Sequence, residues 1–136
     1  MFQTDHLSHS DALKAIEPIQ NKLEKENKGA AVAVTDAHGE LIAFLRTDGC
    51  PLASINNAIN KAFTAARERK PSRAVGEASR NEGFPLTNFG DPRYIGWGGG
   101  VPITYKGKVI GAVGVSGLPE TEDMELAQLG ANAISS

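Results

Sequence analysis

The run Gly96-Trp97-Gly98-Gly99-Gly100 is the part of the sequence most able to do chemistry. Glycine loses more backbone entropy on folding than other residues, so three in succession need a reason. Without side chains, Gly98, Gly99 and Gly100 let a ligand approach the backbone, and their amide hydrogens can hold a carboxylate or another anion. A β-bulge or a tight contact between subunits would use the same run. The pattern therefore predicts close approach and leaves the approaching group open.

Lys61 is the second candidate. It lies at the border of the apolar face of an expected helix, with Ala58 and Ala65 three and four residues away. There its stem can pack while its ammonium group reaches a pocket. It can then bind a carboxylate or, if desolvated, act as a base or nucleophile. The alternative is a lysine that flanks the surface of the helix.

Asp123 lies among acidic residues at the start of the last expected helix, where negative charge complements the helix dipole. That placement favours a mainly structural role. In a catalytic interpretation, Asp123 or Lys61 would do acid–base work. No Ser-His-Asp or Cys-His arrangement in the sequence indicates a reaction class.

Aromatic residues are concentrated before the glycine run. Tyr94 and Trp97, with two phenylalanines, can form an apolar wall for a planar ligand, which Asn88 or Arg93 would orient. The same side chains can equally be core or dimer contacts.

The three histidines, His6, His9 and His38, do not have the i, i+4 spacing of a helical metal site. We therefore expect no structural metal. Heme requires less, since one imidazole and an apolar slot suffice. His9 is the candidate imidazole, and the alternative is a polar residue at a helix start.

Hydrophobic periodicity predicts the elements that position these residues. Residues 10–27 have helical spacing, with a kink or break expected at Pro18. Two further helices are expected at 53–69 and 72–81, the second with Ser72 as a cap, and a last one from about 121. Hairpins are expected from the paired apolar runs 30–35 with 40–45 and 101–105 with 109–115.

The segment 82–101 is a long loop, in which we expect a short strand at Arg93–Trp97. Hairpins rather than helical crossovers link adjacent strands, which favours an antiparallel sheet with helices against it. The sequence thus predicts one α+β domain over residues 1–136.

Composition narrows the function. Fourteen basic and sixteen acidic side chains give a net charge of −2 without a basic block, so we expect no nucleic-acid partner. No stretch approaches the roughly 20 apolar residues that span a bilayer, and we expect no membrane partner. The start of the chain does not have the layout of a signal peptide, and a single cysteine suits a reducing compartment, so we expect a cytoplasmic protein.

Four stretches, taken together and in this order, resemble the GlcG/HbpS family, often labelled heme-binding or heme-degrading. The similarity covers nearly the whole chain. The stretches are Val32-Ala33-Val34-Thr35-Asp36 through Gly39, Lys61-Ala62-Phe63-Thr64-Ala65, Gly98-Gly99-Gly100-Val101-Pro102-Ile103, and Gly111-Ala112-Val113-Gly114-Val115-Ser116-Gly117.

The resemblance implies a profilin-like α-β-α fold with a five-stranded antiparallel sheet, assembled as a homo-oligomer such as a dimer or an octamer. It makes Lys61 a credible site residue, and Asp123 matches an acidic position of the family's pattern. In PduO-type relatives a histidine of the N-terminal helix is associated with heme, and His9 stands near that place.

Three functions follow as hypotheses. The first is a protein that binds a small anionic or planar molecule, with heme as the named candidate, in a catabolic or redox-response pathway. The second is an enzyme of small-metabolite catabolism that uses Lys61 or Asp123. The third is a structural oligomer or partner-binding module, in which the glycines permit subunit packing.

Overall fold

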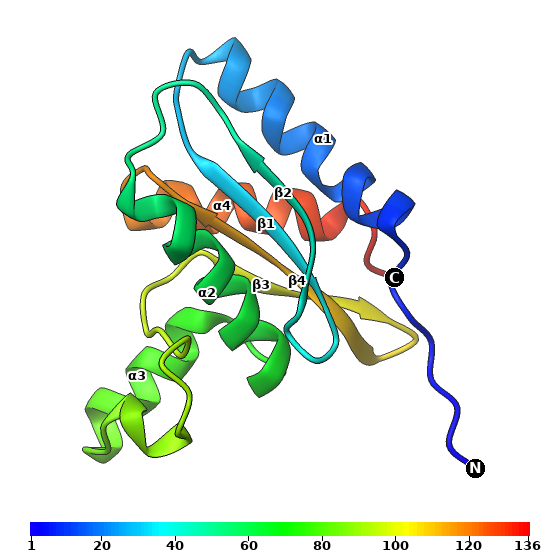
Figure 1. Cartoon of the computed structure of the whole chain (residues 1–136), viewed down its shortest axis with the longest axis vertical. Coiled ribbons are helices and arrows are strands. Elements are labelled where there is room, and N and C mark those ends of the chain that lie inside the picture. Colours follow the sequence, from blue (N-terminus) through cyan, green and yellow to red (C-terminus); the bar gives the residue numbers. More distant parts are fainter.

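The computed structural model describes all 136 residues, which form an antiparallel sheet between two layers of helices (Figure 1). The strands are β1 (Ala31–Asp36), β2 (Leu41–Arg46), β3 (Gly100–Tyr105) and β4 (Lys108–Ser116), in the order β2-β1-β4-β3. The helices are α1 (His9–Lys25), α2 (Ala53–Glu68), α3 (Ser72–Glu82) and α4 (Glu120–Asn132), with a 3-10 turn at Leu86–Phe89. The predicted α+β class and both predicted hairpins are confirmed.

The expectation of five strands is wrong, since the sheet has four. The strand expected at Arg93–Trp97 is absent because its backbone bonds to α2. The amide of Ile95 donates to the Thr64 hydroxyl at 3.0 Å, and that hydroxyl lies 3.4 Å from the carbonyl oxygen of Arg93. Backbone groups used in this way cannot join a strand ladder.

The two faces of the sheet carry side chains of different size. Val32 and Val34 of β1 point into the larger core, formed with α1 and α4. Ala31 and Ala33 point to the other face, where they meet the alanines of α2. Successive residues of a strand alternate between faces, so one strand serves both cores.

Small residues let α2 lie directly on the sheet. A Cβ atom on Gly114 of β4 would overlap the carbonyl oxygen of Ala58 and lie 2.7 Å from the amide nitrogen of Ala62. Only a glycine fits at such a distance. This close approach brings the side chain of Lys61 to the end of β4.

Helix α1 begins with a cap, in which the Ser8 hydroxyl accepts a hydrogen bond from the Asp11 amide at 3.0 Å. It then runs as one helix through Pro18, so of the kink or break expected there, the break is wrong. The packing of Ile16, Ile19 and Leu23 in the main core offsets the lost backbone bond. No helix of the structure is long and apolar enough to cross a membrane.

Candidate functional site

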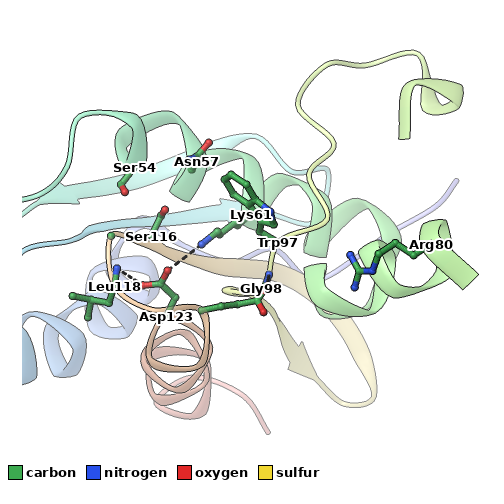
Figure 2. A pocket seen from close by; sticks show the side chains of 11 residues that line it. Ser54, Asn57, Lys61, Arg80, Trp97, Gly98, Ser116, Leu118 and Asp123 are labelled. Atoms are coloured by element: carbon green, nitrogen blue, oxygen red, sulfur yellow. Dashed lines mark hydrogen bonds and ion pairs between the residues drawn. The ribbon is translucent and has the colours of Figure 1, made fainter. Parts of the chain in front are cut away.

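A cleft of about 640 Å³ opens where α2, α4, the end of β4 and the glycine run meet (Figure 2). Its volume lies within the range of roughly 300 to 1,000 Å³ found for small-molecule sites. Eleven residues line it: Ser54, Asn57, Lys61, Arg80, Trp97, Gly98, Ser116, Gly117, Leu118, Glu120 and Asp123. Only two of these residues are hydrophobic, so the cleft is polar.

A buried ion pair forms the floor of this cleft. The ammonium Nζ of Lys61 lies 3.2 Å from Oδ2 of Asp123, and both side chains are less than 5% exposed. Nζ also donates to the carbonyl oxygen of Val115 at 3.0 Å. An ammonium group has three protons, so one remains for a ligand.

Asp123 is held from both sides. Its Oδ1 accepts a hydrogen bond from the amide of Leu118 at 3.0 Å, which connects α4 to the loop after β4. Burial raises the pKa of the Asp123 carboxyl above its ordinary value, whereas Lys61 and the amides of Leu118 and Gly117 act in the opposite direction. A carboxyl group with a raised pKa beside an ammonium group can take or give a proton at the cleft floor.

The glycine run packs against protein groups on each side. A Cβ atom on Gly99 would lie 2.5 Å from the Val115 carbonyl oxygen and 3.0 Å from Lys61 Nζ. On Gly100 it would overlap the carbonyl oxygen of Lys61, and on Gly98 it would lie 2.6 Å from the sulfur of Met124. The predicted close approach is therefore present, and the groups that approach Gly99 and Gly100 come from α2, α3 and β4.

Two of the three glycine amides already have acceptors within the protein. Gly98 N–H donates to Oε2 of Glu120 at 2.7 Å, and Gly100 N–H donates to Oγ of Ser72 at 2.9 Å. The Ser72 hydroxyl in turn donates to the Trp97 carbonyl at 2.7 Å. The free anion-binding amides expected at Gly98 and Gly100 are thus satisfied within the chain. Ser72, expected to cap α3, instead fastens the glycine run.

Of the predicted residues Trp97, Tyr94 and Asn88, only Trp97 lines the cleft. Trp97 lines the rim of the cleft and is 60% exposed, whereas Tyr94 and Asn88 do not line it. The ring of Tyr94 stacks on Phe89 at a centroid distance of 4.1 Å, and its hydroxyl lies 3.2 Å from Oε2 of Glu68. The expected aromatic wall therefore contributes one side chain to the cleft.

His9 lies apart from the cleft. It is exposed at the start of α1, a helix that packs on the opposite face of the sheet from α2 (Figure 1). Helix α1 meets α4 near Gly130, where a Cβ atom would lie 2.8 Å from the carbonyl oxygen of Ala15. The cleft uses the other end of α4, at Glu120 and Asp123. The structure holds no group of three or more His, Cys, Asp or Glu side chains placed to bind a metal ion.

Sequence reasoning missed seven of the eleven lining residues: Ser54, Asn57, Arg80, Ser116, Gly117, Leu118 and Glu120. Ser54 and Asn57 had a readable signal, because they precede Lys61 by seven and four residues on one helical face. Arg80 and Ser116 had none, since their places depend on how α3 and β4 pack.

The fold and the cleft together define a small α+β protein with a polar, ligand-sized cleft at one end of its sheet. The family model described as haem degrading protein HbpS-like matches residues 7–132. The chain belongs to this HbpS-like family, which confirms the predicted resemblance.

Individual relatives agree with this assignment. Protein GlcG of Escherichia coli K12 is 34% identical over 81% of this chain and 81% of its own length. The crystal structure of a double mutant of Streptomyces reticuli HbpS has a TM-score of 0.89 at 30% identity, covering 100% of this chain and 92% of that one. A structure titled as a PduOC complex with heme has a TM-score of 0.85 at 25% identity, covering 96% of each chain. The dimer or octamer that the resemblance implies stays a prediction.

Proposed function

We propose that this protein binds a small molecule in the cleft above Lys61 and Asp123. The observation that carries the proposal is an ion pair that is nearly excluded from solvent yet forms the floor of a ligand-sized opening. Taking two charges out of water costs several kcal/mol per ion, and replacing such a pair by apolar residues is often neutral or stabilising. The pair is therefore better explained by a binding role, in which the Lys61 ammonium group donates to a ligand and the Asp123 carboxylate accepts from it.

The proposal can be tested by obstructing the cleft. Asn57→Trp places a large ring at its edge, and Asn56→Trp makes the same change at the neighbouring exposed position, which does not line the cleft. We expect the wild-type protein and Asn56→Trp to retain a small molecule from a metabolite extract, as seen by native mass spectrometry. Asn57→Trp should lose it. Retention by Asn57→Trp, or no bound molecule in any of the three proteins, would contradict the proposal.

Heme fits this cleft poorly. A heme macrocycle needs an apolar slot and an axial ligand. Two of the eleven lining residues are hydrophobic, and none is a histidine, cysteine or methionine. We therefore place the heme hypothesis at His9 instead. The exposed Leu13, one helical turn further along α1, supplies an apolar neighbour there.

A heme titration followed by absorbance tests this separate site. We expect a saturable shift of the Soret band that weakens in His9→Ala, because the imidazole is the proposed axial ligand. His38→Ala is the matched control, since His38 is exposed in the β1–β2 turn. Asn57→Trp should bind heme as the wild type does. Non-saturating binding, or binding unaffected by His9→Ala, would remove heme from the proposed function.

A further inference from the structure

The ionisable groups around the cleft are paired except for one. Lys61 pairs with Asp123, and Glu120 accepts hydrogen bonds from the Gly98 amide and from Arg73 at 2.8 Å. Arg80 lines the cleft from the last turn of α3 and has no ion pair or hydrogen bond. Figure 2 shows its guanidinium group turned toward the opening. The cleft therefore has one uncompensated positive charge, and it lies at the rim.

Two serine hydroxyls lack partners deeper in the cleft. Ser54 is 6% exposed and Ser116 is 5% exposed, and neither side chain has a hydrogen-bond partner within the protein. They come from α2 and β4 and face the same gap beside Lys61 (Figure 2). Asn57 adds an amide at the same side of the opening. The only fully buried side-chain oxygen without a partner is Thr35 Oγ1, so both serine hydroxyls stay open to the cleft and are free to bond polar ligand atoms.

We infer that the cleft binds a polyhydroxylated carboxylate, with the carboxylate on Arg80 and the hydroxyls on Ser54, Ser116 and the free proton of Lys61. The inference rests on the proposed function and specifies the ligand of the same site. A guanidinium group holds a carboxylate through two parallel hydrogen bonds, which an ammonium group cannot do. Hydroxyls suit the floor because each one both donates and accepts.

The same side chains should disfavour both an apolar acid and an uncharged polyol. A ligand without hydroxyls would cover Ser54 and Ser116 and leave them unpaired, at a cost in affinity for every buried polar group without a partner. A polyol without a carboxylate would leave Arg80 without its counter-charge. Selectivity should therefore require both functional groups in one molecule.

Three matched six-carbon probes separate these contributions: gluconate has a carboxylate and hydroxyls, sorbitol has only hydroxyls, and hexanoate has only a carboxylate. Trp97 is the single tryptophan and lines the cleft rim, so its fluorescence reports occupancy. We expect gluconate to bind at least tenfold more tightly than either other probe. Binding of hexanoate or sorbitol as tight as that of gluconate would overturn the inference.

Single substitutions test the carboxylate contact and the hydroxyl contacts separately. Arg80→Ala should weaken gluconate about tenfold, to the level of sorbitol, and leave sorbitol unchanged. Ser116→Ala should weaken both. Lys14→Ala removes an exposed positive charge on α1, away from the cleft, and should change neither. An equal response to Arg80→Ala and Lys14→Ala would overturn the role of Arg80.

A wrong ligand class can be distinguished from a cleft that binds no ligand. If gluconate does not bind but the Asn57-sensitive molecule from the metabolite extract does, the ligand class is wrong and the cleft remains a binding site. If neither binds, both proposals fail.

Discussion

Replacing Lys61 by methionine should lower the free energy of unfolding by about 3–5 kcal/mol, the range for removal of one partner of a buried pair. The Asp123 carboxylate would stay buried without its counter-charge, 3.2 Å from where the ammonium group was. The carbonyl oxygen of Val115 would also lose its donor. Urea denaturation followed by circular dichroism measures the change.

A second substitution separates the loss of charge pairing from loss of packing. Lys61→Met combined with Asp123→Asn removes the unpaired charge, and the amide oxygen can still accept from the Leu118 amide. We expect the double variant to recover more than half of the lost stability.

The exposed pair between Lys28 and Glu122 is the control. Its atoms lie 3.0 Å apart, but its side chains are 36% and 39% exposed. Lys28→Met should cost less than about 1 kcal/mol, because exposed pairs contribute little. A Lys61→Met variant no less stable than Lys28→Met would refute the buried-pair account.

Gly100→Ala should be the second severe change, at about 3 kcal/mol or more, the upper end of the cost of overpacking. The added Cβ atom would overlap the carbonyl oxygen of Lys61 and lie 2.7 Å from its carbonyl carbon. It would also lie 2.9 Å from the Ser72 hydroxyl that fastens the run. Backbone atoms of a packed helix cannot move aside cheaply, so α2 would have to lift from the sheet.

Gly83→Ala provides the comparison. An added Cβ atom there meets nothing within 4 Å, and only its φ of +74° opposes alanine. That conformation costs roughly 1–2 kcal/mol. Thermal unfolding of both variants decides the matter. If Gly100→Ala melts at or above the temperature of Gly83→Ala, packing does not explain the glycine run.

Local patterns predicted most of the elements correctly because those elements depend on near neighbours. The hairpin of β1 and β2 has apolar runs on both sides of Gly39, and α2 has an apolar face over four turns. Prediction failed where a distant residue competed. Thr64 of α2 takes the hydrogen bonds of Ile95 and Arg93, so no strand forms at that segment.

In the candidate site, too, local patterns predicted single residues, whereas their contacts depend on distant parts of the chain. Lys61 and Asp123 were each identified from their positions in expected helices, but their pairing joins residues 62 positions apart. It depends on how closely α2 lies on the sheet, and hence on Gly114 and the alanines between them. Arg80 reaches the cleft only because α3 folds back toward the glycine run, where Gly76 and Gly96 meet backbone to backbone.

The sequence by itself determined that something approaches the backbone at Gly98-Gly99-Gly100, because a missing side chain is visible in the sequence. Only the tertiary structure decided what approaches. Lys61 and Ser72 pack against Gly99 and Gly100, and Glu120 takes the amide of Gly98. A glycine specifies the absence of a Cβ atom and nothing about its neighbour. The neighbour comes from elements distant in the chain, and their packing against the sheet selects it.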